Sequence, residues 1–393
     1  MTASNHPAGN FSSNSPDTRP LPNLSVLRGL PSQLGVDALV VMSPENFTYT
    51  ANVLLFSLGT IRGRHAFAIL PANREPLALV NTVEYWQMCA ESWIKDIRSY
   101  QEFVDYPGDA LADALIDIGL KRGTIGIDLE YVPAALHARL AVKLPDVQFV
   151  DIGKNIAAIR AVKSKDEINI IEHAARQTHQ AALDAMTRAS LGETERTMAN
   201  RIVDGITNSG ADKLSHLIFA SGERTSAIHG FPTERVPKKS EIIRFDIGGR
   251  YGAWSSDFAR TYSTGEPTLL QQETYRKLWE IYTSTIKMFR AGMATEEPYF
   301  FYMEQVKKAG LNGQPWLGHS FGVETHEYPM VRPGEKAKIE VGMVFNIEPY
   351  VRDSTGMTYE FEDSFVITEQ GPRLLTLGFP PPEIPAIGQP IEG

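Results

Sequence analysis

Two segments of the chain each carry a pair of carboxylates on strand-like stretches that flank a turn. In the first segment, Ile242–Asp246 and Ser256–Tyr262 have the pattern of strands. The stretch between them is prone to turn because of its glycines, Gly248, Gly249 and Gly252. Side chains at opposed positions of a hairpin share one face of the sheet. The pattern therefore predicts that Asp246 and Asp257 lie nearly opposite each other, with converging carboxylates.

The second segment repeats this arrangement further along the chain. Val344–Glu348 and Glu360–Ile367 have the pattern of strands, and Asp353–Gly356 lies between them. Asp and Gly favour a turn at that point. We expect Glu348 and Glu362 to converge as the two aspartates do.

Four carboxylates in one apolar-lined place cannot all stay ionised by themselves, because like charges repel and burial adds a desolvation cost. One or two divalent cations would resolve the conflict. Oxygen ligands with one imidazole suit Mn, Co, Zn or Fe, in a paired site with the metals roughly 3.5–4 Å apart. We assign the imidazole to His319, within Leu317–Gly322, because the glycines on either side let the backbone approach an ion.

Two further histidines are candidates for the same site, His229 in Ser221–His229 and His326 in Thr325–Pro329. Taken singly, each residue is a weak indication, because a lone Asp is more often a turn residue and a lone His is usually structural. The joint order and spacing of the five ligands carry the prediction. We expect the remaining histidines to be structural: His6, His65, His137, His173, His179 and His216.

The composition excludes several classes of protein. A length of 393 residues predicts two domains, and a net charge of −9 argues against non-specific nucleic-acid binding. The longest apolar runs, such as Ala38–Met42, are far shorter than the roughly 20 residues that cross a bilayer. Cys89 is the single cysteine, so no intrachain disulfide can form. Residues 1–22 lack a basic start followed by an apolar stretch, so we expect a disordered tail, no signal peptide and a cytoplasmic protein.

The pattern along the chain places the boundary between the two domains near residue 155. Residues 23–154 alternate strand-like and helix-like stretches, which predicts an α/β domain. Its expected strands are Ala38–Met42, His65–Leu70, Leu77–Val80 and Thr124–Asp128, with a helix in Ala110–Lys121. Residues 155–378 form the second domain, and its first helix begins at a capping box of Ser164 and Glu167. Further helices are expected at Thr194–Ser209, Leu269–Arg290 and Thr295–Ala309, and the Pro-rich residues 379–393 as an extended tail.

These motifs together resemble the creatinase, aminopeptidase P and prolidase family, the pita-bread metallopeptidases, from about Arg160 to Gly371. The matching segments are Ile159–Glu167, Phe245–Gly248, Ser256–Thr261, Gly318–Gly322, His326–Pro329, Ile347–Pro349 and Glu362–Asp363. The resemblance implies an α+β protein in which a smaller α/β creatinase-type N-terminal domain precedes a C-terminal pita-bread domain. It points to an Xaa-Pro peptidase-like member rather than to creatinase itself.

The resemblance also implies the role of each ligand in a binuclear centre, for which manganese is our first expectation and cobalt, zinc or iron the alternatives. Asp257 and Glu362 would bridge the two ions, Asp246 would bind one, and His319 with Glu348 would bind the other. Glu348 would also shuttle the proton to the leaving nitrogen.

The same resemblance gives roles to the two remaining histidines and to one arginine. His229 and His326 would line the site and stabilise the tetrahedral intermediate. Family members often form homodimers in which the N-terminal domain of one chain reaches the site of the other. Arg64, in Ile61–His65, aligns loosely with a stretch of creatinase that supplies an arginine to its substrate.

Three positions depart from the family pattern and concern the substrate side. Glu360 stands where the family usually has arginine, Arg224 where it has asparagine, and Tyr350 where it often has glycine. We take Glu360 as a candidate contact to a cationic or neutral substrate group, with pairing to a nearby arginine such as Arg352 as the alternative. The expected activity is hydrolysis of a C–N bond in a small peptide, as an Xaa-Pro dipeptidase or aminopeptidase. The alternatives are hydrolysis of a small non-peptide amide or a lyase reaction on the same scaffold, and a non-catalytic binding protein of this fold.

Overall fold

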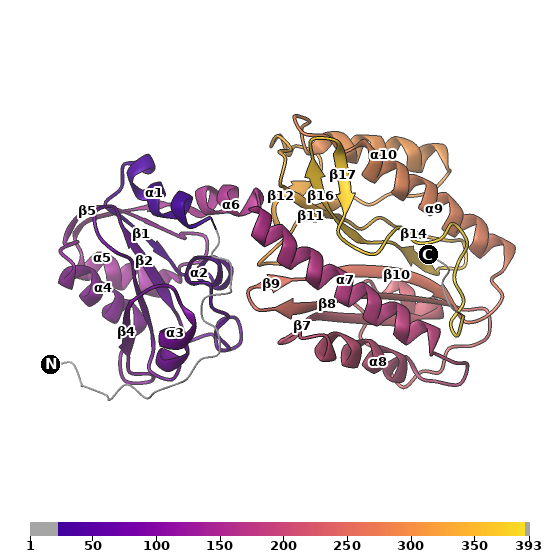
Figure 1. The fold of residues 1–393 in the computed structure, drawn as a ribbon, viewed down its shortest axis with the longest axis horizontal. Helices are drawn as coiled ribbons and strands as arrows, with labels where there is room; N and C mark the ends of the chain where they lie inside the picture. The colour runs from indigo at the N-terminus through magenta and orange to yellow at the C-terminus, as the bar shows by residue number, and fades with distance from the viewer. Residues whose placement is uncertain (1–22, 390–393) are drawn as a thin grey trace. The chain divides into compact units, whose positions relative to one another are not determined.

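The chain divides into two compact units, Met1–Ile156 and Ala157–Gly393. The computed structural model describes residues 23–389, so the tail predicted for residues 1–22 and the last four residues lie outside the described part. Each unit combines helices with its own β-sheet structure (Figure 1).

A six-stranded mixed sheet forms the centre of the first unit, in the order β4-β3-β2-β1-β5-β6. Strand β1 pairs antiparallel with β2 and parallel with β5. Strands β1, β2 and β3 are buried along their whole length, which explains their continuous apolar runs. The strands are β1 Ala38–Val41, β2 Phe67–Pro71, β3 Leu77–Asn81, β4 Asp96–Tyr100, β5 Arg122–Ile127 and β6 Asp146–Asp151. The helices are α1 Leu24–Leu34, α2 Pro44–Ala51, α3 Tyr85–Glu91, α4 Pro107–Asp117 and α5 Ala134–Lys143, and α6 Gly153–Ala161 contains the boundary between the two units.

The second unit contains two main sheets, β10-β8-β7 and β12-β11-β13-β16-β17, and a two-stranded ribbon, β14-β15. Helices α7 and α8 pack on the first sheet, and α9 and α10 pack on the second (Figure 1). The helices are α7 Lys165–Thr187, α8 Glu195–Asn208, α9 Leu269–Met288 and α10 Glu296–Lys308, with a 3₁₀ turn at Gly222–Ser226. The strands are β7 Lys213–Ser221, β8 Ile242–Tyr251, β9 Trp254–Ser255, β10 Phe258–Ser263, β11 Gly318–Ser320, β12 Glu327–Val331, β13 Val344–Ile347, β14 Tyr350–Arg352, β15 Thr358–Glu360, β16 Asp363–Thr368 and β17 Gly371–Leu374.

Helix α7 begins with the capping box that the sequence predicts. The backbone N–H of Ser164 donates to the Glu167 carboxylate at 2.6 Å, and the backbone N–H of Glu167 donates to Ser164 Oγ at 3.3 Å. These two bonds satisfy donors that a helix start otherwise leaves free.

Strand β8 shows how the sequence separates core from site. Ile243, Phe245 and Ile247 belong to the hydrophobic core under α7 and α8. Because successive residues of a strand face opposite sides, Asp246 and Arg244 face away from that core. The apolar side chains of β8 therefore anchor the strand in the core, and its alternate polar side chains face the side on which the site lies.

The Pro-rich segment predicted as an extended tail packs on the second unit as far as it is described. Trp279 Nε1 donates to the carbonyl of Pro380 at 2.7 Å. Ser263 and Ala386 form a parallel bridge, and Ile384 is only 6% exposed. Residues 379–389 are therefore anchored by the domain although they form no helix.

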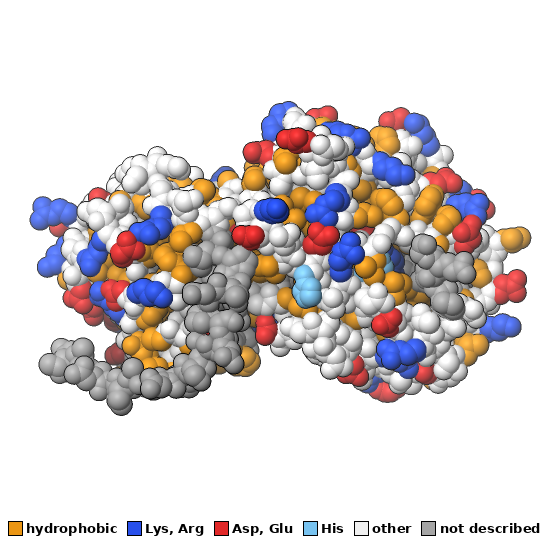
Figure 2. Space-filling view, in the orientation of Figure 1, with side chains coloured by type: hydrophobic (Ala, Val, Ile, Leu, Met, Phe, Trp, Pro, Cys, Tyr) orange, Lys and Arg blue, Asp and Glu red, His pale blue; other side chains and the backbone are white. Residues whose placement is uncertain are grey.

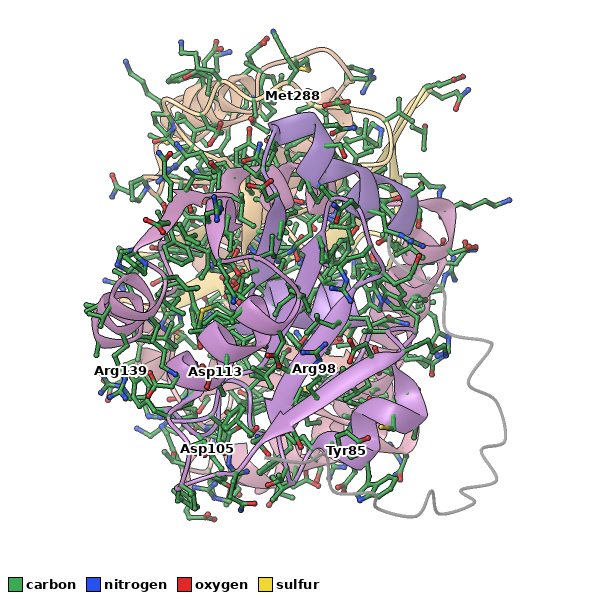
Figure 3. The ribbon with its side chains drawn as sticks, turned by 90° about the vertical axis from the view of Figure 1, so that its left-hand side faces the viewer. Tyr85, Arg98, Asp105, Asp113, Arg139 and Met288 are labelled. Atoms are coloured by element: carbon green, nitrogen blue, oxygen red, sulfur yellow. The ribbon has the colours of Figure 1, made fainter. Side chains whose placement is uncertain are left out.

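The surface carries interspersed positive and negative side chains on the face seen in Figure 2. Arg98, Asp113 and Arg139 are among the residues of the first unit that Figure 3 labels. Arg98 pairs with Asp96 at 3.0 Å, and Asp113 with a lysine at 2.8 Å.

None of the helices in residues 23–389 is both long and apolar enough to cross a membrane.

Candidate active site

The first carboxylate hairpin forms with a register different from the one predicted. Asp246 on β8 pairs with Ala259 on β10, so Asp257 lies two residues from the opposed position, just before β10 begins. Residues two apart share a face, so the two aspartates still converge on a diagonal. The turn is made at Gly252, which has φ 62°. Gly248, which we expected in the turn, lies inside β8. A Cβ at this position would come within 2.0 Å of the Ser256 carbonyl oxygen, so only glycine fits there.

The second carboxylate pair sits at a break between two ladders. Strand β13 pairs with β16, with Ile347 opposite Asp363. Beyond this pair the chain continues into the separate β14-β15 ribbon. Glu348 and Glu362 occupy the junction, one residue beyond the last pair on each strand. The predicted hairpin is therefore interrupted at the two glutamates, which leaves their side chains available to the site.

One backbone bridge brings the two hairpins together. The N–H of Glu362 donates to the carbonyl of Ala259 at 3.0 Å, and these two residues form an isolated antiparallel bridge. Arg260 Nη1 donates to the Glu362 carbonyl at 2.9 Å. Since Ala259 is also the partner of Asp246, Glu362 lies in the same row as Asp246, and Asp257 lies two residues from that row.

Three groups of potential metal-ligating atoms lie within this region, and they share members. Asp257 and His319 each belong to two of the groups, which connects all three into one cluster. In each group the ligand atoms lie within 4.8 Å of one another: His216, Asp246 and Asp257; Asp257, His319 and Glu362; and His319, His326 and Glu348. The structure thus brings together all five of the predicted ligands.

The buried imidazole of His319 is oriented towards the carboxylates. Its Nδ1 lies 3.1 Å from the carbonyl oxygen of Ser320 and donates to it, which leaves Nε2 with a free lone pair. Nε2 lies 2.9 Å from Glu348 Oε1 and 3.8 Å from Glu362 Oε1. With the ring proton on Nδ1, His319 Nε2 and Glu348 Oε1 face each other as two acceptors, and no donor in residues 23–389 bonds to either buried atom. Buried polar atoms are rarely left in this state, so a cation fits the donor set.

The two glutamates of the cluster have raised pKa values. Burial, followed by repulsion from Asp257 and Asp246, holds the pKa of Glu348 well above its usual range. Burial and the charges of Asp257 and Glu348 do the same to the pKa of Glu362. Asn346 Nδ2 donates to Glu362 Oε1 at 2.9 Å and offsets part of this effect. The hydrogen bonds to the cluster therefore do not fully offset the repulsion between its carboxylates.

A cavity of ≈ 680 Å³ opens over the carboxylates, and both candidate histidines line it. His326 lies with its ring centroid 4.1 Å from that of His319 and its Nε2 3.9 Å from Glu348 Oε1. The next residue, Glu327, is buried and accepts from Arg160 at 2.6 Å, which fixes the chain beside His326. His229 is exposed at the rim. The remaining lining residues are Ser215, His216, Leu217, Ile218, Ile228, Phe231, Asp246, Asp257, Trp316, Thr325, Glu348, Tyr350 and Glu362.

His216, which we expected to be structural, lies in the cluster instead. Its Nε2 is 2.8 Å from Asp246 Oδ1 and 3.3 Å from Asp257 Oδ1. Burial disfavours protonation, but the two carboxylates outweigh it and hold the pKa of His216 well above its usual range. The residue lies on β7, a neighbouring strand, so the sequence near the aspartates gives no signal for it.

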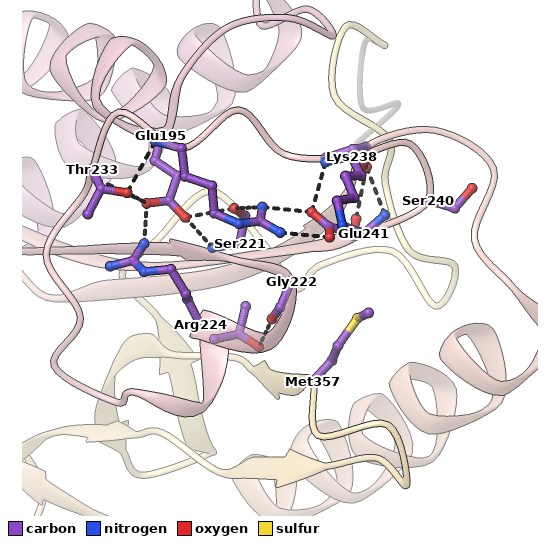
Figure 4. A network of polar contacts seen from close by, with 12 residues as sticks. Glu195, Ser221, Gly222, Arg224, Thr233, Lys238, Ser240, Glu241 and Met357 are labelled. Carbon is purple, nitrogen blue, oxygen red and sulfur yellow. Dashed lines mark hydrogen bonds and ion pairs between the residues drawn. The ribbon is translucent and has the colours of Figure 1, made fainter.

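Arg224 is turned away from the cavity, contrary to its expected place on the substrate side. Its guanidinium pairs with buried Glu195 and donates to the Phe231 carbonyl at 2.9 Å. Glu195 also accepts from Ser221 Oγ and Thr233 Oγ1, each at 2.7 Å (Figure 4). Glu195 therefore ties both ends of the loop that carries His229.

Replacing Glu195 by Ala should destabilise the protein by about 1–3 kcal/mol, because Ser221, Thr233 and the 30% exposed Arg224 lose their acceptor. Denaturant unfolding measures the change. The turnover rate should also fall, because the loop of His229 loses its anchor. The matched control is Glu234→Ala, since Glu234 forms an exposed pair with Arg196 and should cost less than about 1 kcal/mol. Equal stability of the two variants would contradict this role of Glu195.

Glu360 is buried beneath the site and paired with Arg244 rather than with Arg352. Burial raises its pKa to about 8, although Arg244 opposes the shift. Arg244 also donates to the carbonyls of Ala227, at 3.2 Å, and Ile228. These residues precede His229, so the Arg244–Glu360 pair supports the same loop from below. Contact of Glu360 with a substrate stays a prediction.

Arg64 lies in the first unit, in the segment between α2 and β2. Its side chain is partly buried and forms an ion pair with Glu102, with Nη2 2.8 Å from Glu102 Oε2. A partner of this kind fixes the guanidinium in place. Its contact with a substrate across a dimer stays a prediction.

The geometry of the cluster agrees with what sequence comparison finds. Residues 169–369, just over half of the chain, match the model of metallopeptidase family M24. The chain belongs to metallopeptidase family M24. The first unit of this M24 enzyme matches the creatinase/prolidase N-terminal domain over residues 24–162. The predicted fold class, a creatinase-type N-terminal domain before a pita-bread domain, is therefore confirmed, and so is the prediction of a hydrolase.

Individual relatives of this M24 metallopeptidase cover most of its length. An uncharacterised peptidase of Bacillus subtilis is 26% identical over 361 residues, which is 90% of this chain and 97% of the relative. An Xaa-Pro dipeptidase of Pyrococcus furiosus is 30% identical over 234 residues, 58% of this chain and 67% of the relative. The crystal structure of an X-Pro aminopeptidase from Thermotoga maritima superposes with a TM-score of 0.82 at 24% identity, covering 92% of this chain and 99% of that one. That last similarity shows the shared fold.

Proposed function

We propose that this chain is a binuclear metal-dependent peptidase that cleaves the bond preceding proline, as an Xaa-Pro dipeptidase or aminopeptidase. The convergence of Asp246, Asp257, His319, Glu348 and Glu362 carries the proposal. The relative from Pyrococcus furiosus named an Xaa-Pro dipeptidase supports the substrate class.

In this proposal Asp257 and Glu362 would be shared by two divalent ions. Asp246 would help to hold one ion, and His319 with Glu348 would help to hold the other. The place of Asp257 in two of the ligand groups supports its bridging role. When bound, such a pair of ions lowers the pKa of a water molecule and polarises the carbonyl under attack. Asn346 and Arg260 hold Glu362 in position from behind.

The other steps fall to side chains that line the cavity. Glu348 would take the proton from the attacking water and deliver it to the leaving nitrogen, because its carboxylate belongs to the cluster and lines the cavity. His229 and His326 donate to the oxygen on which negative charge develops. Both lie at the cavity and outside the core, which supports a role towards a substrate.

The wall of the cavity suits a proline ring. Leu217, Ile218, Ile228, Phe231 and Trp316 supply apolar surface. The pyrrolidine ring is apolar, and the proline nitrogen carries no N–H in a peptide bond, so such a wall leaves no donor unpaired. The cavity volume of ≈ 680 Å³ lies within the usual range for small-ligand sites, about 300–1,000 Å³.

A substrate screen tests the proposal. The metal-loaded enzyme should hydrolyse Xaa-Pro dipeptides or longer Xaa-Pro peptides, and matched Xaa-Ala peptides much more slowly. Turnover confined to small non-peptide amides would support the alternative hydrolase. Two bound metal ions without turnover of any of these compounds would support a binding protein and overturn the peptidase.

We further propose manganese as the metal, a cytoplasmic location and a homodimer. The first unit exposes several large apolar side chains of the kind enriched at interfaces: Phe56, Val83, Trp86, Phe103 and Val104. These residues support the dimer proposal, and sedimentation equilibrium tests it. A mass equal to that of one chain at micromolar concentration would exclude the dimer.

A further inference from the structure

His216 occupies a place in the cluster that the expected ligand set does not explain. It lies on β7 opposite Gly248 of β8. A Cβ at Gly248 would come within 2.8 Å of His216 Cε1. The absence of a side chain at Gly248 therefore leaves the space through which the imidazole reaches Asp246 and Asp257.

The imidazole is held from its far side by Ser215. Ser215 Oγ lies 3.4 Å from the carbonyl oxygen of Ser256 and donates to it, and it lies 3.0 Å from His216 Nδ1. The serine hydroxyl has one proton, so its oxygen accepts from Nδ1–H. Nε2 is therefore the ring nitrogen that faces the two carboxylates, and a metal ion would replace the proton that they hold on it. An outer hydrogen bond of this kind is the usual way in which a protein orients a histidine that binds metal.

The distances agree with three atoms that share one ion. Nε2 lies 2.8 Å from Asp246 Oδ1 and 3.3 Å from Asp257 Oδ1. Ligand atoms about 2.0–2.2 Å from a common metal are separated by about 3.0–3.4 Å at octahedral or tetrahedral angles. His319 stands in a comparable position on the other side of Asp257, with Nε2 3.9 Å from Asp257 Oδ2.

We propose that His216 is an additional metal ligand on the half of the centre held by Asp246 and Asp257. This inference rests on the proposed binuclear centre and refines it. Each half then has one imidazole, His216 in one and His319 in the other. Oxygen-only sets suit Mg and Mn, whereas imidazole suits Zn, Fe, Ni and Cu. The His216 half should consequently favour zinc over manganese more strongly than an all-carboxylate half would.

Metal binding to the full-length protein tests the proposal without relying on activity. The metal-free wild type, His216→Ala and the control His173→Ala are titrated with Zn(II) and Mn(II) by calorimetry. Wild type and control should bind two ions. His216→Ala should bind one ion normally and the second at least about 10–100-fold more weakly, since even outer-shell changes cost that much. The loss should be larger for zinc than for manganese.

X-ray absorption at the zinc edge provides an independent measurement. The wild type with two zinc ions should show about one imidazole per zinc, and His216→Ala about half of that. His216→Gln keeps a side chain of similar length and serves if the alanine variant does not fold. Unchanged affinities and imidazole count in His216→Ala, with two ions still bound, would overturn the role of His216 alone. A wild type that binds no ion, or an Asp257→Ala variant that keeps both, would overturn the binuclear centre and this inference together.

Discussion

Glu362→Ala and Asp257→Ala are expected to lose one or both metal ions and at least about 10²-fold in kcat/KM. Each variant removes a carboxylate that the proposed centre shares between two ions. Because changes to outer-shell partners already cost about 10–100-fold, loss of a bridge should cost more. Metal content by mass spectrometry and kcat/KM for an Xaa-Pro peptide measure the two effects.

The same variants give a prediction for stability. Ions that bind only the folded state raise its melting temperature, and this metal-dependent rise should shrink or vanish in both variants. Glu362→Gln keeps an acceptor for Asn346 and removes a charge that Asp257 and Glu348 repel, so its metal-free form should be no less stable than the wild type. The control is Asp204→Ala, an exposed position on α8. Full metal content and activity in either alanine variant would contradict the assignment.

His326→Ala should lower kcat by roughly 10²–10³-fold, the effect of removing one donor to a developing oxyanion, while the protein keeps both ions. The side chain is 54% exposed and stands over the cavity. Its Nε2 is 3.9 Å from Glu348 Oε1, a distance that also permits a shared ion. The metal content of His326→Ala therefore distinguishes a donor to the oxyanion, whose loss spares both ions, from a metal ligand, whose loss does not.

The matched control for this variant is His173→Ala, which removes an exposed histidine on α7. It should leave both metal content and kcat unchanged. His326→Gln retains an N–H donor and should recover part of the rate if donation is the role of His326. Parallel loss of metal and rate in His326→Ala would instead make His326 a ligand.

Much of the fold follows from local sequence. The apolar runs of β1, β2 and β3 mark strands that are buried throughout, and the capping box of Ser164 and Glu167 marks the start of α7. The predicted helices of the second unit are present, with ends shifted by one or two residues. These features depend on neighbours in the sequence, so patterns alone suffice to find them.

The carboxylate pairs were predictable for the same reason, although their detailed register was not. Alternation along β8 places Asp246 on the face away from the core. The position of the turn at Gly252 decides which residue of β10 stands opposite. A glycine-rich stretch permits several turns. In the structure the turn lies at Gly252, and Gly248 is in the strand, where its lack of a side chain lets Ser256 come close.

The sequence by itself therefore predicted five residues that the structure brings together, and the tertiary structure decided how they meet and which further residue, His216, joins them. The bridge between Ala259 and Glu362 joins hairpins that are distant in sequence. The partners of Arg224 and Glu360 come from other elements, and His216 enters the site from a neighbouring strand. Sequence patterns predict on which face of its own strand or helix a side chain lies. Which strand or helix lies opposite that face depends on long-range packing, and no local pattern encodes it.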